Sequence, residues 1–78
     1  MNELISKIQP LVEDIAFKSV DSDESLVKSK LIDSIGVVDL VVLLENEFNI
    51  SIDVRDIIEE NFETVQKIAR YIGEKIDE

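Results

Sequence analysis

A chain of 78 residues with 18 acidic and 8 basic side chains carries a formal net charge of −10 at pH 7. This length allows one small domain, residues 1–78, and so acidic a surface repels nucleic acid and anionic membranes while it favours basic protein partners. The chain contains neither cysteine nor histidine, which excludes disulfides, thiolate metal sites and self-contained Ser-His-Asp or Cys-His catalysis. We therefore expect neither an enzyme nor a metal site.

The beginning of the chain, MNELISKIQP, lacks the order of charged and apolar residues that a secretory signal has. The longest uninterrupted apolar run, LVVLL, is far too short to span a bilayer. We expect a soluble, cytoplasmic protein that does not insert into membranes.

The first predicted element is an amphipathic helix. Its apolar residues recur at steps of three and four: Leu4, Ile5, Ile8, Leu11, Val12 and Ile15. Pro10 lies inside this pattern, and because proline cannot donate to the carbonyl of Ser6, we expect a kink or a break near Gln9. Residues 18–30 are polar and aperiodic, which predicts a long loop. Three apolar residues are its expected anchors to the core: Val20, Leu26 and Val27.

The loop contains the segment DSDES, in which Asp21, Asp23 and Ser25 have the spacing of the first ligands in a calcium-binding loop. The position that requires glycine is Leu26, and the position of the bidentate acid is Ile32. We therefore reject a calcium site.

A second helix is predicted at residues 33–48, and it is apolar on two faces. One face is a core stripe: Val37, Leu40, Val41, Leu44 and Phe48. The roughly opposite face carries a second stripe: Ile35, Val38 and Val42. Valine loses side-chain freedom in a helix, so local helix propensity does not explain the valines of the second stripe. The stripe therefore serves either packing or binding. Either the long loop or the third helix covers it, or it is a docking patch with an apolar centre and an acidic rim.

The rest of the chain completes a helical bundle. The segment DVRDIIEEN supports only a turn or two of helix, predicted at residues 54–60, and ISIDV is too short to build a sheet. A last helix begins near Thr64, a good N-cap residue. It presents one apolar stripe: Val65, Ile68, Ala69, Ile72 and Ile76. The predicted fold is all-α, a monomer of three main helices and a short third helix, with a long loop between helices one and two.

Ser34 stands at the start of the second helix, directly after Asp33. Both residue types are favoured N-caps, so capping alone accounts for the dipeptide. If Asp33 caps the helix, the Ser34 hydroxyl is redundant and faces outward. Because the chain has no histidine to activate a serine, Ser34 could react only as the substrate of another protein that supplies the base and the metal.

The segment LIDSIGVVDLVVLLENEFNI resembles the prosthetic-group region of acyl carrier proteins. The shared features are Asp-Ser-apolar at residues 33–35, an acid at Asp39, and the Glu-x-x-Phe ending at Glu45 and Phe48. The resemblance extends over essentially the whole chain, although Lys30 stands where a glycine is common. It implies a carrier phosphoprotein, in which a phosphopantetheinyl transferase attaches 4′-phosphopantetheine from coenzyme A to Ser34. The terminal thiol would then hold acyl groups as thioesters for enzymes of fatty acid or related biosynthesis.

The resemblance also implies two sets of binding residues. Docking to enzymes with basic patches, such as acyl-transferases and synthases, would use the second helix and its surroundings: Asp33, Ile35, Val38, Asp39, Val42, Glu45 and Glu47. A carried acyl chain would be sheltered between the helices, where the expected lining is Leu40, Val41, Leu44, Ile57, Phe62, Ile68 and Ile72. An ordinary packed core with no room for a chain is the alternative.

The cargo and the class of the protein both have alternatives. The stretch EENFETV is longer than the corresponding junction of typical fatty-acid carriers, and it looks more like D-alanyl carrier proteins or other aminoacyl- and polyketide-type carriers. An unmodified acidic helical adaptor would also use an acidic, partly apolar face. Intact mass after treatment with coenzyme A and a transferase separates a carrier from an adaptor.

Overall fold

The structure is a computed structural model that describes residues 2–26, 28 and 34–76, without the side chains of Asn2, Ser34 and Ile35. Three helices dominate it: α1 (Asn2–Ala16), α2 (Ser34–Phe48) and α4 (Val65–Ile76). Two short elements lie between α2 and α4: the 3₁₀ helix η1 (Val54–Asp56) and α3 (Glu59–Phe62). The described ranges contain no β-strand. The all-α prediction with a short third helix is confirmed.

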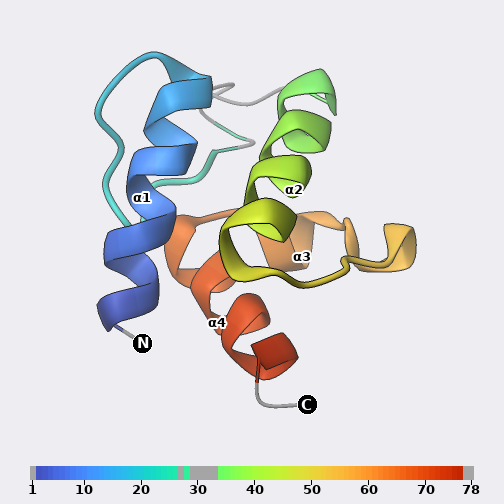
Figure 1. The fold of residues 1–78 in the computed structure, drawn as a ribbon. Coiled ribbons are helices and arrows are strands. Elements are labelled where there is room, and N and C mark those ends of the chain that lie inside the picture. The colour runs from blue at the N-terminus through green and yellow to red at the C-terminus, as the bar shows by residue number, and fades with distance from the viewer. Residues whose placement is uncertain (1, 27, 29–33, 77–78) are drawn as a thin grey trace.

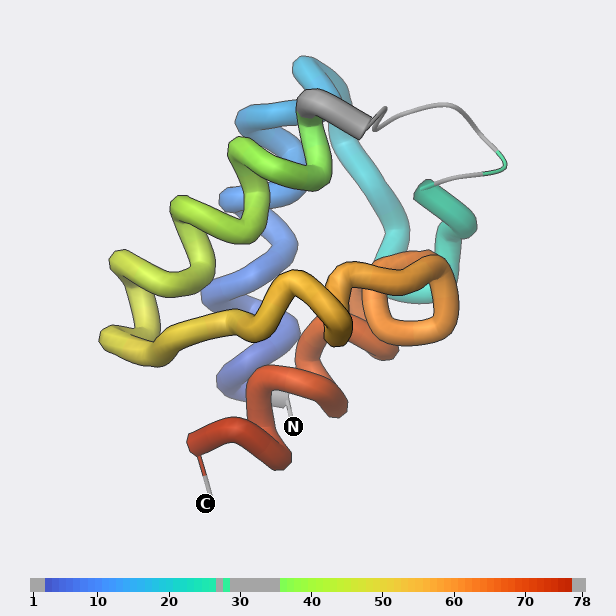
Figure 2. Tube along the Cα trace, turned by 90° about the vertical axis from the view of Figure 1, so that its right-hand side faces the viewer, coloured from blue at the N-terminus to red at the C-terminus, as the bar shows by residue number. Residues whose placement is uncertain are grey.

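The main helices form a bundle in which α1 packs against both α2 and α4, and α3 packs against α4. Figure 1 shows that α1 and α2 run in opposite directions. The C-terminal end of α1 and the N-terminal end of α2 both lie at the top of the bundle, and the perpendicular view in Figure 2 shows the same arrangement. The C-terminal end of α4 lies at the bottom.

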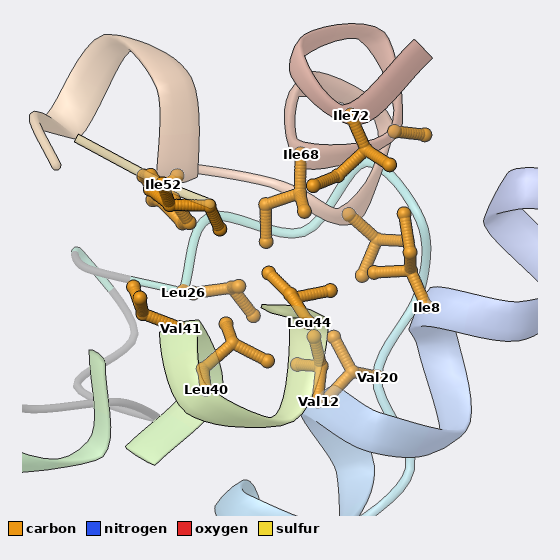
Figure 3. Close-up of a cluster of buried hydrophobic side chains, with 13 residues drawn as sticks. Ile8, Val12, Val20, Leu26, Leu40, Val41, Leu44, Ile52, Ile68 and Ile72 are labelled. Carbon is orange, nitrogen blue, oxygen red and sulfur yellow. The ribbon is translucent and has the colours of Figure 1, made fainter. Parts of the chain in front are cut away.

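Apolar side chains from the helices and from both long connections meet in one core (Figure 3). The buried members are Ile8, Val12, Val20, Leu26, Leu40, Val41, Leu44, Ile52, Phe62, Val65, Ile68, Ala69 and Ile72. The predicted core stripes of the three main helices supply most of them. Of the stripes, only Ile76 is misplaced, because it is the last residue of α4 and 48% exposed.

Pro10 does not interrupt α1, which continues from Asn2 to Ala16. Of the two outcomes predicted near Gln9, a kink or a break, the break is therefore wrong. A proline inside a helix costs about 3 kcal/mol, but Ile8 and Val12 on either side of Pro10 are completely buried and hold both halves of the helix against the core. The Gln9 side chain also donates a hydrogen bond to the carbonyl of Val20.

The loop after α1 is fastened to the bundle at Val20 and at Leu26. The Val20 N–H donates to the Glu13 carboxylate at 2.8 Å, and the Leu26 N–H donates to the carbonyl of Glu63 at 2.7 Å. Val20 and Leu26 are buried, as predicted. The other expected anchor, Val27, lies outside the described residues, as does Lys30.

The region predicted as one short helix at residues 54–60 is two separate elements. The Asp53 carboxylate caps η1 by accepting the N–H of Arg55 at 2.8 Å. The carbonyl of Asp56 accepts a hydrogen bond from the Asn61 side chain at 2.9 Å, and its carboxylate accepts one from the Tyr71 hydroxyl at 2.7 Å. These bonds attach η1 to α3 and α4, and Ile57 between the two elements is not helical.

Candidate functional site

The helix α2 has one buried face and one exposed apolar face. Leu40, Val41 and Leu44 are buried in the core, as predicted. On the other face Val38 is 58% exposed and Val42 is 49% exposed. Neither the described part of the loop nor α3 covers these two valines, so the packing interpretation of the second stripe is wrong for them. The side chain of Ile35, the third member, lies outside the described part.

Ser34 is the first residue of α2. The first N–H groups of a helix have no partners within it, and the helix dipole makes this end positive, so the start of α2 suits an anion. Its first turn contains no acidic residue, like that of α4 and unlike those of α1 and α3. The backbone at the start of α2 therefore favours a negatively charged group. Asp33, the other candidate cap of this helix, lies outside the described residues.

The acidic side chains expected in docking differ in what they contact. Asp39 and Glu47 are exposed. Glu45 is only partly exposed, and its carboxylate accepts the N–H of Ile52 at 2.8 Å. Its carbonyl accepts the N–H of Ile50 at 3.2 Å, which closes the C-terminal turn of α2 around Asn49 at a φ of 54°. Glu45 therefore also fixes the segment that follows α2, a role that sequence reasoning missed.

Glu63 lies between α3 and α4, and its carboxylate connects this region to the long loop. Its carboxylate accepts a hydrogen bond from Lys67 at 2.9 Å and lies 3.8 Å from the Lys28 ammonium. The Ser25 hydroxyl is 3.4 Å from the same carboxylate. The hydrogen bond from Lys67, followed by its charge, lowers the pKa of the Glu63 carboxyl. The spacing of Glu63 and Lys67 was visible in the sequence, but the contact with Ser25 joins residues far apart in the chain.

The family model described as "Phosphopantetheine attachment site" matches residues 5–72. The chain belongs to this family of phosphopantetheine carriers. The D-alanyl carrier protein of Streptococcus mutans is 30% identical over 74 residues, which cover 92% of this chain and 94% of that protein. The D-alanyl carrier protein of Streptococcus suis strain 05ZYH33 is 35% identical over 66 residues, covering 82% of this chain and 84% of the relative.

Membership in the family establishes the cofactor and the general role of the chain. Its members carry covalently attached 4′-phosphopantetheine and are carriers rather than catalysts. Carriers of this kind interact with phosphopantetheinyl transferases and with acyl-transfer enzymes. The resemblance to carrier proteins inferred from the sequence is confirmed.

The residues expected to line a pocket for an acyl chain lie together in the core of the carrier. Six of these residues are buried members of the same cluster: Leu40, Val41, Leu44, Phe62, Ile68 and Ile72. The seventh, Ile57, is partly buried and packs against them. In the described part a hollow of about 410 Å³ lies elsewhere, lined by polar and aromatic residues of α3 and α4: Glu60, Asn61, Lys67, Arg70, Tyr71 and Glu74. That lining does not suit an acyl chain.

Two further kinds of site are absent from the described ranges. No group of three or more acidic side chains there is placed to hold a metal ion. None of the helices there has the length and apolar character that a membrane span requires.

Proposed function

We propose that Ser34 is the residue of this carrier protein to which phosphopantetheine is attached. The observation that carries this proposal is that Ser34 opens α2, the helix whose exposed face bears Val38 and Val42. An enzyme that docks on this face is also close to the start of the helix. Two other serines, Ser22 and Ser25, are engaged in hydrogen bonds that fasten the long loop.

Attachment is a phosphoryl transfer. The Ser34 Oγ attacks the phosphorus of coenzyme A nearest to the pantetheine arm, the pyrophosphate bond breaks, and adenosine 3′,5′-bisphosphate leaves. The serine proton needs a base, and this chain has no histidine, so the transferase supplies the base and the metal. The N-terminal end of α2 then favours the negative charge of the phosphodiester.

The bound group supplies a thiol that this cysteine-free chain lacks. The protein's own part is to hold the attachment point on a rigid helix and to present a docking face. That face combines the exposed valines with the exposed acids Asp39 and Glu47. Its partners are enzymes with basic patches, which acidic rim charges attract over a distance. Asp33, Ile35 and Glu45 belong to the same proposed face.

We propose D-alanine, or a similarly small aminoacyl group, as the cargo. The relatives reported above are named D-alanyl carrier proteins. A long acyl chain would need shelter, because burying each CH₂ is worth about 0.8 kcal/mol. The residues that would provide it are packed against one another in the core. An alanyl group has one methyl and an ammonium, so it has little need of such shelter. The fatty-acid cargo of the first hypothesis is therefore less well supported.

We further propose that the carrier works as a monomer in the cytoplasm. A net charge of −10 on so small a domain opposes self-association, and the donor of the prosthetic group, coenzyme A, is a cytoplasmic metabolite. Size-exclusion chromatography with light scattering checks the first part, and a dimer buried through Val38 and Val42 would contradict it.

Intact mass spectrometry after incubation with coenzyme A and a phosphopantetheinyl transferase tests the attachment. The wild-type chain should gain one phosphopantetheine and the Ser34→Ala variant none, with similar unfolding midpoints for both. Peptide mapping then locates the group. A chain that gains nothing would contradict the attachment, and a label on Ser6, Ser19, Ser22, Ser25, Ser29 or Ser51 would overturn the assignment to Ser34.

The cargo is tested on the modified protein. It is offered D-alanine, L-alanine or a long fatty acid, each with ATP and an enzyme that activates that acid. Rapid formation of the D-alanyl thioester, measured by mass, supports the proposal. Preferential loading with the fatty acid would contradict it.

A further inference from the structure

Phe17, the residue that directly follows α1, is an exposed aromatic in a left-handed backbone conformation. Its φ is 62°, and 92% of its surface is exposed. Its N–H donates to the carbonyl of Glu13 at 2.8 Å, which is the single hydrogen bond of an αL helix cap. Glycine and asparagine are favoured in this conformation, because the Cβ of other residues crowds the backbone.

The end of α2 has the same kind of left-handed cap, but with a residue type that favours this conformation. Asn49 occupies the corresponding position, directly after the last residue of α2, with a φ of 54°. A phenylalanine at such a cap can repay its strain by packing against the helix, but the Phe17 side chain is almost fully in solvent. Neither helix capping nor core packing accounts for an aromatic at this position.

The position of Phe17 in the bundle links it to Ser34. The two helices run in opposite directions and pack against each other, so the end of α1 and the start of α2 lie at the same end of the molecule (Figures 1 and 2). Phe17 directly follows the last residue of α1, and Ser34 is the first residue of α2. An enzyme that acts on the hydroxyl of Ser34 must therefore approach the end of the bundle where Phe17 is exposed.

We propose that Phe17 is an aromatic anchor that inserts into an apolar pocket of the phosphopantetheinyl transferase. This inference rests on the proposed function of Ser34. The transferase is the enzyme that must come closest to this end of the bundle, because the bond it makes is at the serine oxygen itself. Enzymes that act on the thiol work at the far end of a long arm, and they can dock on the face of Val38 and Val42 instead. Exposed aromatic residues that become buried at the centre of an interface contribute much of its affinity.

The variant Phe17→Asn separates this role from a structural one, because the two roles predict opposite changes. Asparagine adopts the left-handed conformation more readily, so the unfolding temperature should stay the same or rise by a few degrees. Removal of an anchor should lower kcat/KM for modification with coenzyme A by about tenfold or more, mainly through a higher KM for the carrier. A structural role would lower the unfolding temperature and leave kcat/KM of the folded variant unchanged.

Two controls complete the experiment, which uses a transferase that modifies the wild-type chain. Phe17→Tyr keeps the aromatic ring and should keep most of the activity. Ile76→Asn removes another exposed apolar side chain, at the last residue of α4 and the bottom of the bundle, and should not change kcat/KM.

A Phe17→Asn variant with wild-type kcat/KM, or with a loss that Ile76→Asn shares, would overturn the anchor. Failure of the wild-type chain to be modified at Ser34 would instead overturn the proposed function.

Discussion

The two faces of α2 predict that neighbouring valines fail in different ways. Val41 and Val42 are adjacent in the same helix, but Val41 is 7% exposed and Val42 is 49% exposed. Valine and serine have similar helix propensities, so a change of either residue to serine leaves the intrinsic stability of the helix nearly unchanged. A difference in stability between Val41→Ser and Val42→Ser therefore reports the difference in burial of the two side chains.

The expected magnitudes follow from these exposures. Full burial of a valine side chain is worth about 1.5–3 kcal/mol, and a serine hydroxyl buried without a partner costs about a further 1–3 kcal/mol. Val41→Ser should therefore lower the free energy of unfolding by about 3 kcal/mol or more. Val42→Ser removes a half-exposed side chain and should cost less than about 1 kcal/mol. For a domain of this size 1 kcal/mol corresponds to about 4–8 °C in unfolding temperature, so the two variants should differ clearly.

Circular dichroism during urea and thermal unfolding measures the stability, and the rate of thioester formation on modified carrier measures docking. Val42→Ser and Val38→Ser should lose transfer activity at every salt concentration while they unfold close to the wild type, because an apolar contact with a partner is not screened by ions. A Val42→Ser variant that unfolds as early as Val41→Ser would show that the second stripe is core. Full activity at unchanged stability would show that this face does not dock.

Three other properties can be measured on the unmodified chain. Thr64→Ala removes the oxygen that accepts the N–H of Lys67 at 3.0 Å at the start of α4, and it should cost about 1 kcal/mol in chemical unfolding, with Thr64→Ser as the control that keeps the cap. The pKa of the Glu63 carboxyl is lowered in the folded chain, so the ionised carboxylate stabilises the fold at pH values above its ordinary pKa of 4.5. This contribution is lost as the pH falls through the lower pKa of the folded state. The stability gap between wild type and Glu63→Gln, from urea midpoints, should therefore narrow as the pH falls below that value, and a gap independent of pH would contradict this. Added salt should raise the unfolding midpoint of this chain of charge −10, because it screens self-repulsion.

The features that could be predicted from the sequence are those set by local periodicity and local capping. The stripes of α1, α2 and α4 place Ile8, Leu44 and Ile68 in the core because a helix repeats every 3.6 residues. Thr64 caps α4 through an N–H three residues away. The two apolar stripes of α2 could be separated because no single core can contact both sides of one helix.

The features that could not be predicted depend on contacts between distant parts of the chain. The continuity of α1 through Pro10 depends on the packing of Ile8 and Val12 against other elements, which outweighs the local cost of proline. Ile76 has the spacing of the apolar stripe, but it is the last residue of α4 and lies partly in solvent at the end of the bundle. The attachment of the long loop through Glu63 likewise joins residues from separate segments.

The double role of Glu45 decides how the charges of the docking face should be tested. Reversal of a rim charge should slow association with a basic partner most at low ionic strength, and the effect should shrink as salt screens it. Asp39 is exposed, so Asp39→Lys should show this salt dependence with little change in unfolding midpoint. Glu45→Lys also removes the acceptor of the Ile52 N–H, so we expect it to destabilise the fold at every salt concentration. Salt-dependent transfer rates together with urea unfolding of both variants separate the two effects. If Asp39→Lys lost activity equally at low and high salt, a charged rim around Val38 and Val42 would be excluded.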